Sequence, residues 1–333
     1  MLQKALNALI LLIVTVTLAS GQGGHGNDLI VHTRTGTFIG DLNDTYPDVR
    51  QFKYVPYAKP PVGPKRWTSP EPLDNSASII DSTVFGPACS QYVSSLPSIY
   101  SLNVTGANIL NYGESPTAGQ VARDSAEDCL SLAIWTPSGA TPTSNLPVIH
   151  FFTGGGDVNG GTNIPAQLPS HWVHRSQKHI VVTSNYRVNI FSFPNARGLS
   201  GNTNFAFQDQ RLAIEWVAEN IASFGGDPSR ITLWGQSAGS GMSDMYLSTW
   251  YDDPIIRASI SSSGFALGYP GVKSADPNGT DFTFVAKSMG CDFEDDPERE
   301  LECMRRVPMP QIENFIGQYQ DNGTVWKAGR PRS

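Results

Sequence analysis

The chain has 333 residues, of which 39% are hydrophobic and 16% charged, with a formal net charge of −7 and a pI of about 5.3. This length is enough to bury a sizeable core, in one large domain or two small ones. The negative charge and the lack of any Lys/Arg-rich run argue against nucleic acid and anionic membrane surfaces as partners.

The first 21 residues have the layout of a secretory signal peptide. Lys4 lies near the start, an apolar run covers 5–18, and small residues occupy 19–21. An uncleaved membrane anchor is the alternative, but the run is shorter than the ~20 residues that a span requires. No later apolar stretch is long enough to cross a bilayer. We therefore expect a secreted, extracellular protein without stable membrane insertion, with residues 22–333 as one domain.

The first half of the domain predicts strands. Residues 29–42 alternate in polarity and contain turn residues, as a β-hairpin does. Residues 49–67 begin as a strand that ends in prolines, which cannot continue a ladder. After a polar, serine-rich region, residues 130–137 and 146–156 predict two more strands, the second ending in glycines.

The second half alternates between strands and helices. Its predicted elements are a strand over 179–188, a helix over 205–228, a strand over 230–237, a helix over 238–250, a strand over 255–264 and a helical region from about 281 to 320. The clearest helix carries one apolar stripe at helical spacing, which we assign to the core: Leu212, Trp216, Val217, Ile221 and Phe224. This alternation predicts an α/β protein with a mostly parallel central sheet flanked by helices.

The chain contains four cysteines: Cys89, Cys129, Cys291 and Cys303. In an oxidising compartment they predict two disulfides, and spacing alone permits three pairings. Nearest-neighbour pairing is the simplest, and its long and short loops correspond to about 4 and about 3 kcal/mol in chain-entropy terms. Metal binding is the alternative, but no pair has CxxC spacing and no histidine lies near the second pair. We expect no metal and no cofactor.

Four N-x-S/T sequons are consistent with export: Asn43, Asn103, Asn278 and Asn322. In a secreted protein they predict surface loops that can carry glycans.

The stretch "GQSAG" matches G-x-S-x-G, with Ser237 at its centre. A nucleophile on a strained strand-to-helix turn needs small flanking residues, which explains Gly235 and Gly239. The β-rich "ITLW" before it and the helix-forming run after it give the motif its required context. A glycine-bearing turn without chemistry is the alternative interpretation.

The stretch "FTGGGD" (152–157) ends an earlier predicted strand. Consecutive glycines allow backbone N–H groups to approach a substrate, as an oxyanion hole requires. A flexible turn or a phosphate loop is the alternative. G-x-G-x-x-G fails because Asn159 occupies the last glycine position, and no G-K-[ST] follows nearby.

Together these motifs resemble the type-B carboxylesterase family, which includes carboxylesterases, cholinesterases and fungal-type lipases. The matching stretches occur in family order over residues 29 to about 307: "FKYVPYAKPPVG", "EDCLSLAIWTP", "FFTGGG", "NYRVNIF", "DQRLAIEWVAENIASFGGDPSRITLWGQSAGS" and "AKSMGCDFEDDPERELECMRRV". The resemblance implies an α/β-hydrolase fold, incomplete at its C-terminal side in this sequence, and hydrolysis of carboxylic esters through an acyl-serine intermediate.

The resemblance also implies roles for individual residues. Ser237 would be the nucleophile, and the backbone N–H groups of Gly155, Gly156 and Ala238 would form the oxyanion hole. The implied disulfides are Cys89–Cys129 and Cys291–Cys303. The expected partner is a small-molecule ester or a lipid, and the oligomeric state is not indicated.

The sequence departs from the family at three points. An aromatic residue usually follows the three glycines, where this chain has Asp157, whose charge would oppose an oxyanion unless it points away or is paired. Gln236 replaces a frequent Glu before the nucleophile. In the family the triad acid and histidine follow the serine far downstream, and this sequence ends at Ser333 before either is expected.

All six histidines precede Ser237, and none is an obvious base: His25, His32, His150, His171, His174 and His179. We expect His150 to be a core residue and the three that follow it to be solvated surface residues. The chain as given is therefore expected to be a poor esterase, and a truncated gene model or damaged copy of a longer esterase is one explanation. The strand over 255–264 would then lie at an exposed sheet edge.

The loop between Cys89 and Cys129 gives the substrate clues. It lacks the tryptophan that holds quaternary ammonium groups in cholinesterases, which disfavours choline esters. It carries enough apolar residues for a lid, although an ordinary surface loop explains them equally well: Leu96, Ile99, Leu102, Ile109 and Leu110. A non-catalytic esterase-like adhesion or binding module is the alternative function, and the retained Ser237 favours the enzyme.

Overall fold

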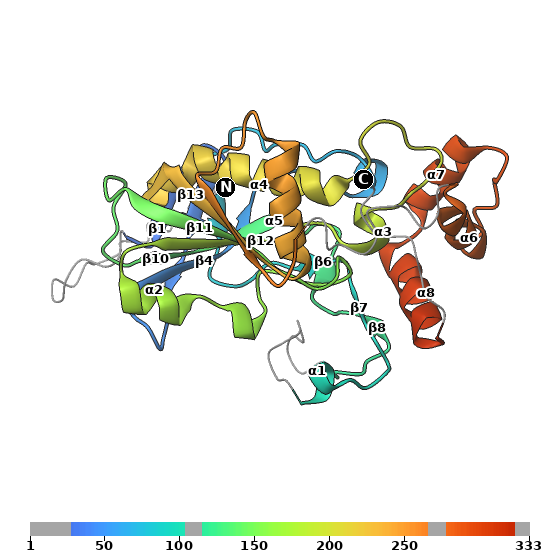
Figure 1. Ribbon diagram of the computed structural model, residues 1–333, viewed down its shortest axis with the longest axis horizontal. Helices are drawn as coiled ribbons and strands as arrows, with labels where there is room; N and C mark the ends of the chain where they lie inside the picture. The colour runs from blue at the N-terminus through green and yellow to red at the C-terminus, as the bar shows by residue number, and fades with distance from the viewer. Residues whose placement is uncertain (1–27, 104–114, 266–277, 324–333) are drawn as a thin grey trace, which may run out of the picture.

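A seven-stranded mixed sheet forms the centre of the molecule (Figure 1). The computed structural model describes residues 28–103, 115–265 and 278–323. Across the sheet the strands run in the order β14 (Ala258–Ser262), β13 (Gly226–Gln236), β11 (Leu146–Phe152), β12 (Ile180–Ser184), β10 (Ser131–Pro137), β4 (Val49–Pro56) and β3 (Asp41–Leu42).

Only half of this sheet is parallel, so the prediction of a mostly parallel sheet is wrong for its N-terminal side. Strands β14, β13, β11 and β12 are parallel neighbours. Strand β10 is antiparallel to both β12 and β4, and β4 is antiparallel to β3. In each parallel pair a helix lies in the chain between the two strands, because a parallel return needs a crossover.

Smaller β-structures surround the central sheet. A three-stranded sheet contains β1 (Ile30–Thr33), β2 (Gly36–Ile39) and β5 (Ile79–Asp81). Two short pairs hold the first disulfide loop, and they are β6 (Ala88–Cys89) with β9 (Ser125–Ala126), and β7 (Tyr92–Val93) with β8 (Gln120–Val121).

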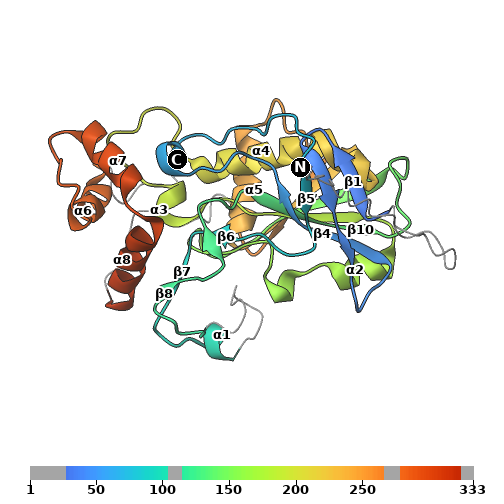
Figure 2. The same ribbon diagram turned by 180° about the vertical axis from the view of Figure 1, so that it is seen from behind.

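Helices cover both faces of the central sheet (Figures 1 and 2). Helix α4 (Phe205–Asn220) lies above the sheet and α2 (Ser170–Ser176) below it in both views. Alternate residues of β10 enter different cores: Leu132 and Ile134 pack with the α4 side, Ala133 and Trp135 with the α2 side. This follows from the period of two along a strand, and it explains why all of β10 is buried.

The apolar stripe predicted for 205–228 is confirmed as core, with four of its five residues fully buried and Leu212 partly buried. The α-helix ends at Asn220, one 3-10 turn (Ile221–Phe224) follows, and Gly225 ends it at φ 98°. A left-handed glycine at this position is a common helix stop.

The remaining helices include three that form a second core beside the sheet (Figure 1): α6 (Thr280–Ser288), α7 (Pro297–Arg306) and α8 (Met309–Asp321). The others are α1 (Ile99–Leu102), α3 (Asn189–Ser192) and α5 (Ala238–Thr249), with short 3-10 turns at Gly63–Lys65 and Pro165–Gln167. Within the described ranges, no helix is long and apolar enough to span a membrane. The signal peptide predicted for residues 1–21 lies outside those ranges.

The cysteines form the two disulfides that the family resemblance implies, Cys89–Cys129 and Cys291–Cys303. The first closes a loop of 40 residues in sequence separation and joins β6 to the start of β10. The second, with a separation of 12, ties the residues after α6 to α7.

Candidate active site

Ser237 occupies a sharp turn between β13 and α5. Its φ of 53° and ψ of −122° are unfavourable for a residue with a side chain. Its N–H donates to the carbonyl oxygen of Ser262 at 2.8 Å, and its own carbonyl oxygen accepts from Gly241 at 3.1 Å. These bonds, one to the neighbouring strand and one to the following helix, hold the strained turn in place.

The glycines beside Ser237 are required by close backbone approach. A Cβ on Gly235 would lie 2.1 Å from the carbonyl oxygen of Gly239. A Cβ on Gly239 would lie 2.3 Å from the carbonyl oxygen of Phe152, at the end of β11. Any side chain here would push α5 away from the sheet, which is the physical reason for glycine on both sides of the turn.

The glycine loop (residues 154–160) lies directly against this turn. Phe152 pairs with Gly235 in the β11–β13 register, so the loop begins level with the serine turn. A Cβ on Gly154 would lie 2.9 Å from the Cβ of Ser237. Gly155 and Gly156 follow at φ 132° and 65°. The two motifs identified in the sequence therefore meet at the carboxyl edge of the parallel strands.

The residues implied for the oxyanion hole are two members of the glycine loop and the first residue of α5. Among the described residues, no group accepts a hydrogen bond from the N–H of Gly155, Gly156 or Ala238. Ala238 is also the first residue of α5, where the helix dipole favours negative charge. Chemically, such an arrangement can stabilise an oxyanion.

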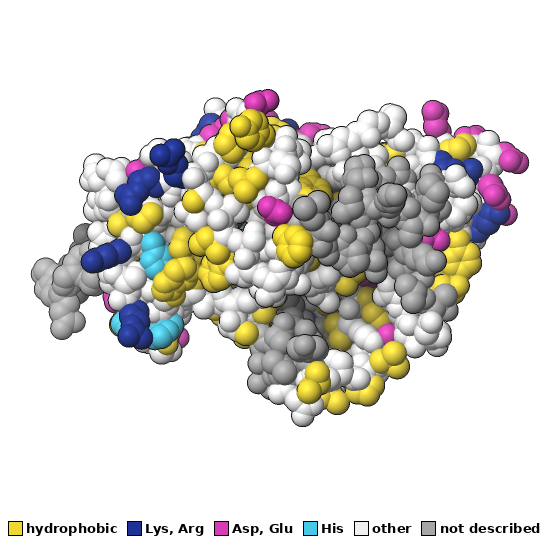
Figure 3. Space-filling view, in the orientation of Figure 1, with side chains coloured by type: hydrophobic (Ala, Val, Ile, Leu, Met, Phe, Trp, Pro, Cys, Tyr) yellow, Lys and Arg dark blue, Asp and Glu magenta, His cyan; other side chains and the backbone are white. Residues whose placement is uncertain are grey.

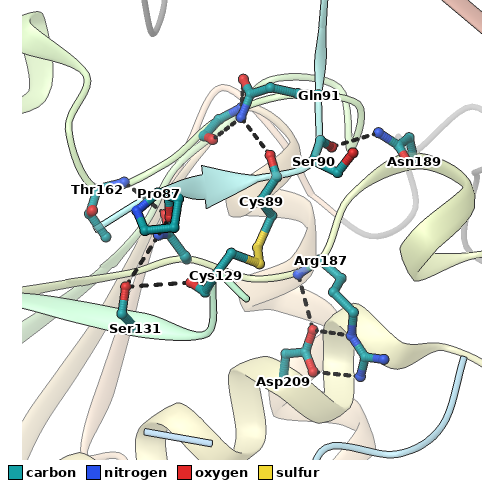
Figure 4. The surroundings of a disulfide bond; sticks show 12 residues. Pro87, Cys89, Ser90, Gln91, Cys129, Ser131, Thr162, Arg187, Asn189 and Asp209 are labelled. Atoms are coloured by element: carbon teal, nitrogen blue, oxygen red, sulfur yellow. Dashed lines mark hydrogen bonds and ion pairs between the residues drawn. A yellow bond between two sulfur atoms is a disulfide. The ribbon is translucent and has the colours of Figure 1, made fainter. Parts of the chain in front are cut away.

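The loop is fastened through Gln91, a residue that the sequence analysis missed (Figure 4). Its Nε2 donates to the carbonyl oxygens of Cys89 at 2.9 Å and Gly160 at 3.0 Å, and its Oε1 accepts from the N–H of Gly160 at 3.3 Å. Gln91 thus joins the first disulfide to the end of the glycine loop. Its only signal in the sequence is its position two residues after Cys89.

Asp157, the first departure from the family pattern, is a buried residue in the middle of the glycine loop. It is 2% exposed, has a φ of 61°, and its carbonyl oxygen accepts from the N–H of Asn189 at 2.6 Å. Burial raises the pKa of Tyr186 well above its ordinary value, and the Asp157 carboxylate adds to that shift. The negative charge of Asp157 thus helps to keep the Tyr186 phenol protonated. The phenol donates a hydrogen bond to the carbonyl oxygen of Thr153 at 2.6 Å.

A cavity of about 480 Å³ extends from the glycine loop toward the first disulfide loop. This volume is in the range of small-molecule sites. Gln236, the second departure from the family pattern, is one of the residues that line the cavity. The lining contains both polar and apolar residues: Gln91, Tyr92, Val93, Ser94, Leu96, Pro97, Ser98, Ser101, Pro116, Gly154, Gly155, Asn159, Gly160, Ile164, Gln167 and Gln236.

The outer wall of this cavity is an arm built on β7, β8 and α1, at the bottom of Figure 1. Leu96, Ile99 and Leu102 are exposed on it, and apolar side chains are visible there in Figure 3. Ile109 and Leu110, the other apolar residues proposed for a lid, lie outside the described residues.

Helix α8 holds this arm. The carboxylate of Asp321 accepts from Tyr92 Oη at 2.9 Å, from Ser94 Oγ, and from both N and Oγ of Ser95 at 2.7 Å. The Tyr92 ring rests on Gly317, where a Cβ would approach the ring to 2.1 Å.

His150 is a buried core residue, as expected. Its Nε2 lies 3.0 Å from Ser184 Oγ, and burial lowers its pKa to about 3. Its register partner on β13 is Leu233, four residues before Ser237. At about 3.3 Å per residue, His150 is roughly 13 Å down the strand from the serine.

The prediction of surface positions for the three following histidines is confirmed for His171 and His174 and wrong for His179. His174 Nδ1 lies 2.7 Å from Asp48. His179 is buried because its Nδ1 bonds Ser176 Oγ at 2.6 Å and its ring lies 4.4 Å from that of Trp172, and burial lowers its pKa.

None of the described histidines supplies a base. His179 directly precedes β12, at the amino edge of the parallel strands, whereas Ser237 follows β13 at the carboxyl edge. His32 bonds Thr37 in the first hairpin, and His25 lies outside the described residues. Within the same ranges, no three His, Cys, Asp or Glu side chains are grouped so that they could hold a metal ion.

The sequons differ in accessibility. Asn103, Asn278 and Asn322 are exposed. The Nδ2 of Asn43, the atom that would carry a glycan, instead donates to Gln51 Oε1 and Ser170 Oγ, both at 3.3 Å. Asn43 Oδ1 also accepts from the N–H groups of Thr45 and Tyr46. A glycan at Asn43 would have to displace part of this network.

The strained serine between β13 and α5, the free amides of the adjoining glycine loop and the open central sheet are the features of an α/β-hydrolase-type protein. Comparison with known sequences agrees. The model of the carboxylesterase family matches residues 27–328, and the chain belongs to that family.

Several curated proteins are similar to this chain. "Secreted lipase 5" of Gibberella zeae is 40% identical over 328 residues, which cover 93% of this chain and 59% of the lipase. "Chlorogenic acid esterase" of Aspergillus niger is 41% identical over 304 residues, with 90% and 56% covered. "Lipase 4" of Diutina rugosa is 34% identical, with 88% and 51% covered. The chain thus spans between half and three-fifths of the length of these relatives.

Proposed function

We propose that this chain carries the nucleophile and the oxyanion hole of a secreted serine hydrolase that cleaves carboxylic esters. Ser237 Oγ attacks the carbonyl carbon, and the N–H groups of Gly155, Gly156 and Ala238 bind the negative charge that develops on the carbonyl oxygen. The alcohol leaves with a proton, and water then hydrolyses the acyl-serine to regenerate the hydroxyl.

One observation carries this proposal: a strained serine with the glycine loop packed directly against it. Holding a non-glycine residue at φ 53° costs about 1–3 kcal/mol, and such strain is concentrated at functional sites. A turn without chemistry would relieve that cost with a glycine. The amides without a hydrogen-bond acceptor among the described residues supply the second half of the argument, because Gly155 is partly exposed and Gly156 is exposed, so a ligand can reach their N–H groups.

A small-molecule ester or a lipid is the proposed substrate. The cavity beside the glycine loop has both polar and apolar walls, which accommodates an ester with a polar part. The names of the relatives, two lipases and a chlorogenic acid esterase, support this class. Choline esters have less support, because no tryptophan lies between Cys89 and Cys129.

Turnover by the chain as given is proposed to be slow, because no described histidine reaches Ser237. In serine hydrolases the loss of the base costs about a millionfold in rate, or about 8 kcal/mol. The oxyanion hole and binding alone still leave a residual rate of about a thousandfold over water.

Labelling by a fluorophosphonate tests the proposal. We expect covalent modification at Ser237 only on prolonged incubation at high probe concentration, because no described histidine activates the hydroxyl, with the site located by peptide mass spectrometry and the label lost completely in Ser237→Ala. The matched control is Ser243→Ala, a buried serine about one and a half turns along α5 that does not flank the loop. A well-folded chain without any label at Ser237 would instead support a non-catalytic binding module.

Secretion and the boundaries of the domain are part of the same proposal. The two disulfides support an oxidising compartment, and two relatives of this chain are named as secreted lipases. When the chain is expressed with residues 1–21, the protein should be found in the culture medium, with an N-terminus near residue 22. Retention of those residues in cell-bound protein would contradict it.

A further inference from the structure

Asn189, the first residue of α3, has a backbone conformation that requires an explanation. It is a non-glycine residue at φ 50° and is only 5% exposed. A left-handed conformation costs an L-residue about 1–2 kcal/mol. Its N–H donates to the carbonyl oxygen of Asp157 at 2.6 Å, so this strained residue holds the middle of the glycine loop.

The side chain of Asn189 is what fixes this conformation. Its Nδ2 donates to the carbonyl oxygen of Ser90 at 2.9 Å, a contact drawn in Figure 4, and to both carboxyl oxygens of Glu313 at 3.1 Å. Its Oδ1 accepts from the N–H of Phe191 at 3.2 Å. A glycine would tolerate the same φ but would make none of these contacts.

Glu313 is the centre of this arrangement, although it lies on α8, far from Ser237 in sequence. It is 3% exposed, and its Oε2 also accepts from Ser90 Oγ at 3.1 Å. Burial raises its pKa to about 7, against the opposing effect of the hydrogen bonds from Ser90 and Asn189. It does not line the cavity, so it has no direct contact with a substrate there.

The glycine loop is thereby fastened at two points that lead back to the same carboxyl group. Asn189 holds Asp157, and Gln91 holds Gly160 by two hydrogen bonds. Gln91 is the residue after Ser90, which Glu313 binds through its hydroxyl. Of the two residues that hold the loop, Asn189 is itself a hydrogen-bond partner of Glu313, and Gln91 is the chain neighbour of another partner, Ser90.

We propose that Glu313 is a positioning residue that fixes the glycine loop against Ser237 by holding Asn189 and Ser90 in place. The mechanical part of this inference stands on the contacts alone. Its consequence for catalysis rests on the proposed function, in which the loop carries the oxyanion donors. Displacement of such a donor by about 1 Å costs about a hundredfold in rate.

Hydrogen exchange of individual amides tests the mechanical part without any need for activity. The reporters are the N–H groups of Gly160 and Asn189, which are bonded across the network. Glu313→Leu preserves the size of the side chain and removes its acceptors, and we expect both amides to exchange at least tenfold faster. Glu313→Gln keeps an acceptor for Ser90 and Asn189 and should restore most of the protection.

Asp321→Asn is the matched control. It changes a carboxylate on the same helix that binds the arm and makes no contact with Asn189 or Ser90. If Glu313→Leu affects the loop amides no more than Asp321→Asn does, or if Glu313→Gln exchanges as fast as Glu313→Leu, the positioning role is refuted.

Asn189→Gly keeps the inference testable should Glu313→Leu fail to fold. Glycine accepts φ 50° without strain and retains the N–H to Asp157, but it loses the link to Glu313. The expected result is faster exchange of the Gly160 amide, again by at least tenfold. Unchanged exchange at Gly160 would overturn the proposal.

Labelling of Ser237 separates this inference from the proposed function. If the unmodified chain is labelled, Glu313→Leu should slow labelling about tenfold and Glu313→Gln should restore it. If the unmodified chain is not labelled, the proposed function fails, while the exchange rates still decide whether Glu313 holds the loop.

Discussion

At the scale of single residues, the chemistry of this chain depends on backbone positions that a side chain would disrupt. Ser237 and both flanking glycines were predicted from the sequence, because G-x-S-x-G has a steric meaning that needs no coordinates. Asn189 and Gln91 were not. Their roles arise from contacts with residues 30 to more than 120 positions away, which leave no local pattern.

The contact between Gly239 and β11 gives the first prediction. In Gly239→Ala the new Cβ would meet the carbonyl oxygens of Phe152 and Thr153 at 2.3 and 2.6 Å, so the helix must shift. We expect the free energy of unfolding to fall by about 3 kcal/mol, measured by urea denaturation. Gly139→Ala, whose Cβ would meet nothing within 4 Å, should change it by less than about 0.5 kcal/mol. Equal effects at both positions would contradict this account.

The buried carboxyl of Glu313 gives a pH prediction. Its pKa of about 7 in the folded chain lies above its ordinary value of 4.5, so the folded state keeps a proton that the unfolded state releases. The stability from this group is fully present below about pH 4.5 and is lost as the pH rises through 7, at up to about 1.4 kcal/mol per pH unit. Denaturation at pH 5 and pH 7.5 should show this loss relative to Glu313→Gln. Parallel pH profiles for the two proteins would argue against it.

At the scale of elements, the long strands and helices could be predicted, and the short pairs could not. The stripe on α4 has helical periodicity over several turns, and the prediction for its core residues is confirmed. The pairs β6–β9 and β7–β8 contain two residues per strand, too few to show any periodicity, and they fall in the region predicted only as polar and serine-rich. That region nevertheless forms the outer wall of the cavity.

The two disulfides should stabilise the chain unequally. In the chain-entropy model a crosslink with a separation of 40 residues contributes about 4 kcal/mol and one of 12 residues about 3 kcal/mol. We therefore expect Cys89→Ser with Cys129→Ser to lower the free energy of unfolding more than Cys291→Ser with Cys303→Ser, by about 1 kcal/mol in urea denaturation. The reverse order would show that strain or residual structure in the unfolded chain outweighs loop length.

At the scale of the whole molecule, the fold class was predicted and the direction of half the sheet was not. Alternating strands and helices indicate parallel pairs, and this holds for β11 to β14. The N-terminal strands carry no comparable signal, because buried antiparallel and parallel strands have the same apolar pattern. The sequence also gave no indication that α8 supports both the cavity wall and the glycine loop.

The outer strand β14 carries the last prediction. Among the described strands it pairs only with β13, and Ile260 on it is 47% exposed. An exposed apolar edge promotes association between chains. Ile260→Lys should reduce light scattering at high protein concentration several-fold and leave the free energy of unfolding within about 0.5 kcal/mol. Ser261→Lys, at an exposed position on the same strand, is the comparison, and an identical benefit there would mean that added charge alone is responsible.

The grip of Asp321 on Tyr92, Ser94 and Ser95 has a consequence for how the chain is made. These partners lie 226 to 229 residues apart, so the arm leaves the ribosome long before the helix that clamps it. During synthesis the nascent arm therefore lacks its contacts with α8 until that helix has left the ribosome, and only its own disulfide loop connects it to the sheet. A ribosome stalled before residue 321 would therefore present a folded sheet and serine turn beside an arm without its clamp.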